Sequence, residues 1–133
     1  MKVLALDYGS ARTGVAVSDP TGTIARPIGV VERAASESGL ARIAELVREE
    51  EAERVVVGLP LTLRGERGEQ ARETERFVEA LQAVVDVPVE SYDERFTTRL
   101  AQRMPGLLAT SEDSRAAAHL LESWLAARER IGD

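Results

Sequence analysis

An aspartate near the N-terminus interrupts a run of apolar residues. Asp7 follows Val-Leu-Ala-Leu6 and precedes Tyr-Gly-Ser10, and the apolar run before it is typical of a buried strand. A carboxylate at the end of such a strand is costly to remove from water unless it is paired, hydrogen-bonded or bound to a metal ion. The same residue could simply cap a turn. Asp7 is therefore a candidate metal-binding residue whose role depends on partners elsewhere in the chain.

Two other acidic positions could supply those partners. Asp93 and Glu94 follow a second strand-like segment, and Asp113 begins the last helical pattern, four residues before Ala117. That spacing places Asp113 on the helix face that carries the apolar residues. Each position also has a simpler explanation. Asp93 and Glu94 could form a solvated turn, and Asp113 could cap its helix, since Thr110-Ser-Glu-Asp113 has the pattern of a capping box.

Together, three converging carboxylates would repel one another unless cations lay between them. Two divalent ions about 3.5–4 Å apart can activate water and stabilise a leaving oxygen, which is the chemistry of phosphodiester hydrolysis. Oxygen ligands favour Mg²⁺ or Mn²⁺ over zinc. The candidate catalytic and metal-binding residues are Asp7, one of the adjacent pair Asp93 and Glu94, and Asp113.

Arginines near these acids could hold the phosphate backbone of a nucleic acid, because guanidinium groups suit bidentate phosphate contacts. The candidates for substrate binding are Arg12, Arg64, Arg95 and Arg99. The loop Arg64-Gly-Glu-Arg-Gly68 could also offer backbone N–H groups at the start of a helix, or could be no more than a glycine-rich turn. The net charge of -6 is a mild argument against nucleic-acid binding, although much of the acid lies in helical segments.

The composition narrows the other possibilities. The 133 residues suit one domain, 1–133, with its own core, and 44% hydrophobic and 30% charged residues are ordinary for a globular protein. No cysteine is present, which excludes disulfides, thiolate zinc sites and cysteine nucleophiles. No signal peptide or membrane span is visible, so a cytoplasmic location is the expectation. The sequence leaves open whether the protein is a monomer or a homodimer.

Hydrophobic periodicity predicts the elements that position these residues. The predicted strands are Lys2–Tyr8, Thr13–Ser18, Thr23–Val31, Arg54–Gly58 and Val87–Tyr92. The predicted helices are one that begins near Ser36, Glu69–Val84, a short Thr97–Arg103 and Ser111–Arg130. Asp19-Pro-Thr-Gly22 has the residues of a type I turn, and Pro27 favours an edge strand or an irregularity. In the last helix Trp124 is expected in the core and His119 on the surface.

The order of these elements predicts an α/β fold. The first three strands are joined by short turns and must be antiparallel, whereas the apolar fourth strand should be central and parallel. Two βα crossovers then complete a mixed five-stranded sheet with helices on both faces, which is the ribonuclease H-like arrangement. With the first strand between the second and the fourth, the ends of the first and fifth strands meet at one edge. Asp7 and the adjacent pair of Asp93 and Glu94 should lie there, with Asp113 brought in by the last helix.

Four segments resemble the YqgF/RuvX family of small bacterial ribonuclease H-like proteins, in order and over nearly the whole chain. They are Leu6-Asp-Tyr-Gly-Ser-Ala-Arg-Thr-Gly-Val-Ala-Val-Ser-Asp-Pro20, Val55-Val-Val-Gly-Leu-Pro-Leu61, Tyr92-Asp-Glu-Arg-Phe-Thr-Thr98, and Asp113 with the leucine-rich helix that follows. The resemblance implies a metal-dependent nuclease that uses Asp7, Glu94 and Asp113. It implies action on pre-16S rRNA in ribosome biogenesis, or on branched DNA in the manner of a Holliday junction resolvase.

Two other hypotheses remain open at this point. Asp7-Tyr-Gly9 before a second strand also resembles the phosphate loop of ATP-dependent phosphotransferases, although the chain is short for the second domain that such enzymes need. A non-catalytic module that binds nucleic acid or a ribosome-assembly partner would explain the acidic net charge. A metal titration and a cleavage assay would separate these hypotheses from a nuclease.

Overall fold

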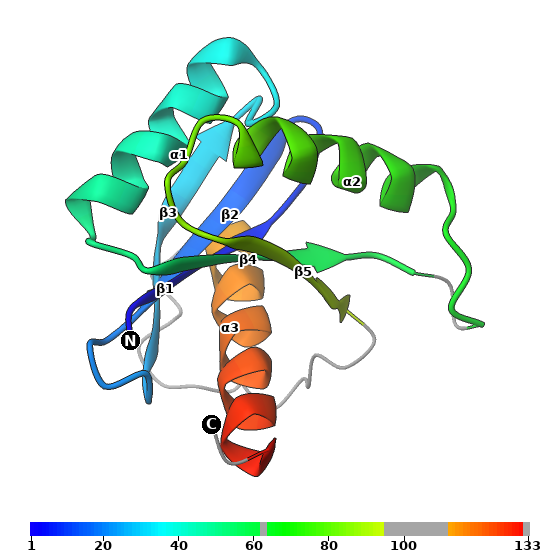
Figure 1. Ribbon diagram of the computed structural model, residues 1–133. Coiled ribbons are helices and arrows are strands. Elements are labelled where there is room, and N and C mark those ends of the chain that lie inside the picture. The colour runs from blue at the N-terminus through cyan, green and yellow to red at the C-terminus, as the bar shows by residue number, and fades with distance from the viewer. Residues whose placement is uncertain (62–63, 95–111, 132–133) are drawn as a thin grey trace.

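A mixed five-stranded sheet in the order β3-β2-β1-β4-β5 forms the centre of the structure (Figure 1). The computed structural model describes residues 1–61, 64–94 and 112–131. The strands are β1 (Val3–Asp7), β2 (Arg12–Ser18), β3 (Ala25–Glu32), β4 (Arg54–Leu59) and β5 (Val89–Asp93). β1 pairs antiparallel with β2 and parallel with β4, so it is the central strand, as predicted. β3 and β5 complete the sheet by antiparallel and parallel pairing.

Three helices cover the two faces of this sheet. α1 (Glu37–Glu49) and α2 (Glu69–Gln82) lie on one face and α3 (Glu112–Ile131) crosses the other (Figure 1). Ser36 caps α1, because its side-chain oxygen accepts a hydrogen bond from the backbone N–H of Gly39 at 3.1 Å. The predicted α/β fold with helices on both faces is confirmed. The short helix predicted at Thr97–Arg103 lies outside the described residues.

The turn between β2 and β3 follows the residues that predicted it. The Gly22 N–H donates to the Asp19 carbonyl oxygen at 2.9 Å, which closes the four-residue turn. The Asp19 carboxylate accepts from the backbone N–H groups of Thr23 and Ile24, and these bonds hold the pKa of Asp19 far below its usual range. Pro27 lies in the edge strand β3 beside a shift in register, which confirms the predicted irregularity.

Alternation along β1 divides its side chains between two cores. Leu4 and Leu6 are fully buried against the face covered by α1 and α2. Val3 and Ala5 face α3 instead, where they pack in a separate cluster. Because side chains alternate along a strand, Asp7 falls on the α3 side of the sheet, while Tyr8 packs against the cluster under α2.

The buried surface of α3 is broader than the predicted stripe. Trp124 is in the core as predicted, with the guanidinium carbon of Arg128 4.7 Å from the ring centroid. His119, predicted to lie on the surface, is instead only 7% exposed. The prediction was wrong because α3 packs across β1, β2 and β3 together, so the helix buries more than the single apolar stripe visible in its sequence. No helix among the described residues is long and apolar enough to cross a membrane.

Candidate active site

Parallel pairing brings the first two acidic residues to the same edge of the sheet. Asp7 is the last residue of β1, and Glu94 directly follows β5. Both strands flank β4 and run parallel to it, so their carboxyl ends meet, which is where open α/β sheets commonly bind ligands. The carboxyl groups of Asp7 and Glu94 share a hydrogen bond. The structure therefore brings together the first two predicted site residues.

Burial raises the pKa values of both carboxyl groups in this pair. Loss of water, followed by the hydrogen bond and the charge of Asp7, raises the pKa of Glu94 from 4.5 to about 7. Burial also raises the pKa of Asp7, and the negative charge of Asp113 adds to it, whereas the hydrogen bond from Glu94 acts in the opposite direction. A hydrogen bond between two carboxyl groups requires a proton on one of them. Below about pH 7 the metal-free pair therefore holds one proton.

Asp113 reaches this edge from the other side because β2 has a glycine opposite Asp7. Gly14 is the register partner of Asp7, and a β-carbon at position 14 would overlap the backbone carbonyl of Asp113. The start of α3 thus lies directly on the backbone of β2. Asp113 is close enough for its charge to raise the pKa of Asp7. Its own carboxylate forms an ion pair with Arg12, with Arg12 Nε 3.5 Å from Asp113 Oδ2.

A second strand glycine makes room for Glu94. A β-carbon at position 58, in β4, would lie 2.7 Å from Glu94 Oε1 and 3.2 Å from a methyl carbon of Leu120. Glycine inside a strand often marks a site where another group approaches the backbone closely. Gly14 and Gly58 stand on the two strands that flank β1, so the sequence carried a signal for both. Their role in positioning the acids was not predicted from it.

The other predicted site residues have mixed outcomes. Glu94 rather than Asp93 pairs with Asp7, while the negative charge of Asp93 helps to raise the pKa of Glu94. Arg12 lies beside the acids as predicted. Arg64 is exposed in the segment before α2. Arg95 and Arg99, and the Thr110 and Ser111 of the capping alternative for Asp113, lie outside the described residues.

Comparison with known proteins identifies the family of the chain. The family model described as RuvX, Holliday junction resolvase, matches residues 1–127. The chain belongs to the RuvX family. A protein of Chloroflexus aggregans named "Putative pre-16S rRNA nuclease" is 44% identical over 133 residues, covering 95% of this chain and 94% of that protein. A Nocardia farcinica protein of the same name is 42% identical over 142 residues, covering 96% of this chain and 79% of that one.

Solved structures show the same fold at low sequence identity. RuvC of T. thermophilus in complex with a Holliday junction substrate superposes with a TM-score of 0.69 at 20% identity, covering 98% of this chain and 96% of that chain. The Fowlpox virus resolvase in complex with Holliday junction DNA gives a TM-score of 0.54 at 11% identity over the full length of both chains. The ribonuclease H-like arrangement predicted for this RuvX family member is thus shared with two resolvases.

A cavity of about 250 Å³ opens beside the Asp7–Glu94 pair. It runs from the β1–β2 loop to the first turns of α2 and is lined by Asp7, Tyr8, Gly9, Ser10, Pro60, Gln70, Glu73, Thr74 and Glu94. The prediction missed the contribution of α2, namely Gln70 and Glu73. Their signal in the sequence is spacing: both precede Phe77 on the helix face that turns toward the sheet.

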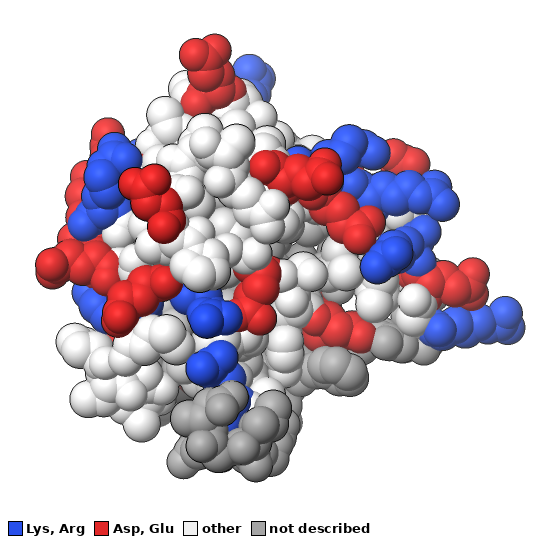
Figure 2. Space-filling model, in the orientation of Figure 1, with Lys and Arg blue, Asp and Glu red and all other residues white. Residues whose placement is uncertain are grey.

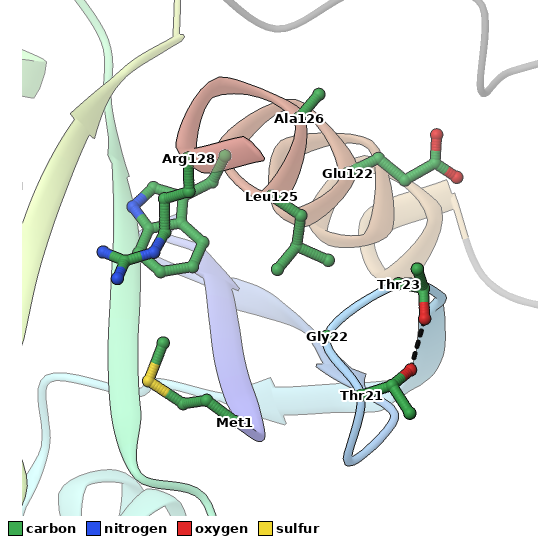
Figure 3. Close-up of a pocket in the computed structure, with 9 residues that line it drawn as sticks. Met1, Thr21, Gly22, Thr23, Glu122, Leu125, Ala126 and Arg128 are labelled. Atoms are coloured by element: carbon green, nitrogen blue, oxygen red, sulfur yellow. Dashed lines mark hydrogen bonds between the residues drawn. The ribbon is translucent and has the colours of Figure 1, made fainter. Parts of the chain in front are cut away.

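A larger cavity, of about 520 Å³, lies at the other end of α3 (Figure 3). Figure 3 shows Leu125 of α3 facing the turn at Gly22, with Met1 and Arg128 at the side of the cavity. None of the three predicted acids lines it. The smaller cavity at the sheet edge is therefore the candidate active site of this RuvX family member.

The donor set at this edge fits a hard divalent cation in its chemistry. Its groups are carboxylate oxygens, which Mg²⁺ and Mn²⁺ prefer, and the proton shared by Asp7 and Glu94 occupies a place that a cation could take. Within residues 1–61, 64–94 and 112–131, no three acidic or histidine side chains stand close enough to enclose an ion as they are placed. The third acid, Asp113, is paired with Arg12 at 3.5 Å.

The raised pKa values predict an unusual pH dependence of stability in the absence of metal. Glu94 binds its proton more tightly in the folded than in the unfolded protein, so its contribution to stability is complete below pH 4.5 and is lost as the pH rises through about 7. We expect the free energy of unfolding in EDTA to fall by about 1–2 kcal/mol between pH 5 and pH 8, after allowance for solvent screening at this partly exposed site. Urea unfolding at several pH values measures it. A Glu94→Gln variant should show a flatter profile; equal slopes in both proteins would contradict the assignment.

Proposed function

We propose that the protein is a divalent-metal-dependent nuclease that hydrolyses phosphodiester bonds in structured nucleic acid. The observation that carries this proposal is the contact between the Asp7 and Glu94 carboxyl groups at the carboxyl edge of the sheet, beside the charge of Asp113. Groups that are costly to ionise are expected where a ligand supplies the missing positive charge. Pre-16S rRNA is the proposed substrate, because relatives 39–44% identical carry the name of a nuclease for that RNA.

Asp7, Glu94 and Asp113 are the proposed ligands of one or two Mg²⁺ or Mn²⁺ ions. When bound, such ions supply an activated water and stabilise the oxygen that leaves the phosphate. Asp7 stands between the other two acids and would hold the metal together with each of them. The Glu94 side chain packs over Gly58, and the backbone carbonyl of Asp113 packs over Gly14. The two strand glycines therefore leave room for both acids. Arg12 would exchange its contact with Asp113 for a contact with phosphate.

Exposed arginines are proposed to hold the rest of the substrate. The Arg12 side chain is 66% exposed at the rim of the site, so a phosphate can reach it. Basic side chains also gather over α2 and the segment before it on the face shown in Figure 2, where Arg64 and Arg72 are exposed. Acidic residues are interspersed among them, which agrees with the net charge of -6. Arg95 and Arg99 stay predictions for the same role.

A cleavage assay over three substrate classes tests the proposal. We expect cleavage of a structured RNA that spans the 5′ end of 16S rRNA in Mg²⁺ or Mn²⁺, and none in EDTA. Single strands of the same sequence serve as the matched comparison for structure. Failure to cleave any substrate with either ion, together with no Mn²⁺ binding by calorimetry, would overturn the nuclease proposal and favour the non-catalytic module.

Resolution of branched DNA is the second candidate function. It is favoured by the description of the family model, Holliday junction resolvase. A four-way DNA junction in the same assay distinguishes the two: symmetric cuts near the branch point, without RNA cleavage, would replace the RNA substrate with DNA. A cytoplasmic location is part of the proposal, because ribosomes are assembled in the cytoplasm of bacteria such as those that contain the relatives. A homodimer stays a prediction that sedimentation analysis can check.

A further inference from the structure

The cavity beside the candidate active site extends past the catalytic acids to the other face of the sheet. Asp7 lies on the α3 side of β1, whereas Tyr8 and the α2 residue Glu73 lie on the opposite side, yet all three line the same cavity. The cavity therefore wraps around the edge of the sheet. The α2 end of the cavity would therefore hold a part of the substrate next to the reacting phosphate.

Glu73 is held in a fixed position at this end. The Tyr8 hydroxyl donates a hydrogen bond to Glu73 Oε2 at 2.8 Å. The Tyr8 ring stacks on the buried Phe77, with centroids 4.5 Å apart, so the phenol cannot swing freely. Among the described residues no partner contacts the second oxygen, Oε1.

The charge of the lining decides what kind of group fits. Among the described residues, three carboxyl groups line the cavity, from Asp7, Glu73 and Glu94, and none of the described lining residues is a lysine or an arginine. A phosphate at the α2 end would be repelled by these carboxylates, because the nearby Arg76 is not among the described lining residues and is paired with Glu69 instead. The remaining polar groups, including the Gln70 amide, are hydrogen-bonding and neutral. The best occupant is a neutral group that donates hydrogen bonds to a carboxylate.

We propose that this cavity is a subsite for the nucleotide adjoining the cleaved phosphate, and that Glu73, positioned by Tyr8, accepts a hydrogen bond from it. The inference rests on the proposed nuclease function. The volume of about 250 Å³ is slightly below the ~300–1,000 Å³ of typical ligand pockets, which suits part of one nucleotide rather than a longer segment. In a nucleic acid the neutral donors are the amino or imino groups of a base and the ribose 2′-hydroxyl. Glu73 thus selects nucleotides that carry such a donor.

Two substrate series separate the possible donors. The first varies the base on each side of the mapped cleavage position through all four nucleotides, and the second replaces the ribose at the same positions by 2′-deoxyribose. We expect wild-type kcat/KM to differ by about tenfold or more within one series, the size of a well-placed hydrogen bond to a base edge or hydroxyl. Dependence on the base identifies the amino or imino donor, and dependence on the sugar identifies the 2′-hydroxyl.

The variants test whether Glu73 is responsible. Glu73→Gln removes the charge with little change in size, and Tyr8→Phe removes only the hydroxyl that holds Glu73. Both should reduce the selectivity ratio to below about threefold, whereas Glu79→Gln, an exposed change on the same helix, should leave it intact. Circular dichroism melting shows whether each variant is folded. If Glu73→Gln is not folded, the selectivity ratio of Tyr8→Phe tests the subsite. The subsite would be overturned if both variants kept the wild-type selectivity ratio in kcat/KM. It would also be overturned if the wild-type protein showed no selectivity in either substrate series.

Binding measurements keep this inference separate from the proposed function. Fluorescence anisotropy with the same oligonucleotides in phosphorothioate form reports affinity without cleavage. Oligonucleotides that bind with a Glu73-dependent preference but are never cleaved in their natural form would overturn the nuclease proposal and support the subsite. Cleavage without any nucleotide preference would support the nuclease proposal and overturn the subsite. Absence of both cleavage and preferential binding would overturn the two proposals together.

Discussion

Replacement of Asp7 by asparagine should abolish cleavage while making the metal-free protein more stable. The loss in kcat should be about a thousandfold or more, since interactions with a catalytic metal contribute several kcal/mol and ~4 kcal/mol corresponds to three factors of ten. The gain in stability follows from the pKa of Asp7, which burial and the charge of Asp113 raise. Removing this carboxylate relieves a repulsion that the folded protein otherwise bears. Cleavage kinetics and thermal melting in EDTA at pH 8 measure the two effects.

The opposite signs of these two effects separate a catalytic role from a structural one. A residue that only capped a turn would lose stability on replacement and would affect cleavage through it. Asp86→Asn, an exposed change in the segment after α2, is a suitable control and should alter neither quantity. A wild-type cleavage rate in Asp7→Asn, or a lower melting temperature in EDTA, would exclude the assignment of Asp7 as the central metal ligand.

Replacement of Gly14 by alanine should give the largest loss of stability. The added β-carbon would occupy the place of the Asp113 carbonyl, a backbone group that cannot rotate away, so the start of α3 must shift. Overpacking of this kind costs about 3 kcal/mol, or roughly 10 °C in melting temperature for a domain of this size. Since the shift moves Asp113 away from Asp7, cleavage should fall further than the fraction of unfolded protein explains.

A second glycine provides the control for this substitution. Gly68, at the start of α2, has no atom within 4 Å of the position that a β-carbon would take. Gly68→Ala should therefore cost less than about 1 kcal/mol, mainly through the weaker cap that alanine provides. Urea unfolding of both variants compares them directly. Equal costs at the two positions would show that α3 does not depend on contact with the backbone of β2.

The fold was predictable because local signals agreed with one another. Periodic apolar residues located the five strands, and the turn at Asp19–Gly22 required the first strands to be antiparallel. The fully apolar segment that became β4 could only be central. The burial of His119 was not predictable, because the sequence of a helix does not show how many strands the helix will cross.

The site was predictable only in part, for a different reason. Asp7 and Glu94 follow strands whose order was predicted correctly, so their meeting is a consequence of topology. Glu73 comes from a helix above the sheet, and its contact with Tyr8 depends on the rotation of α2 about its own axis. The apolar pattern of α2 indicates that Phe77 faces the sheet, but it does not show that this face lies over Tyr8, because the two residues come from separate elements.

Asp7 also helps to set the alignment of the sheet during folding. Both faces of β1 are apolar up to this residue, so hydrophobic burial alone discriminates weakly between the native pairing with β2 and a pairing displaced by one residue. A displaced strand would turn the carboxylate of Asp7 into the dry core beneath α2 and expose Tyr8 on the opposite face. The cost of burying that charge would disfavour the displaced pairing, so the acid proposed for catalysis also favours the native register.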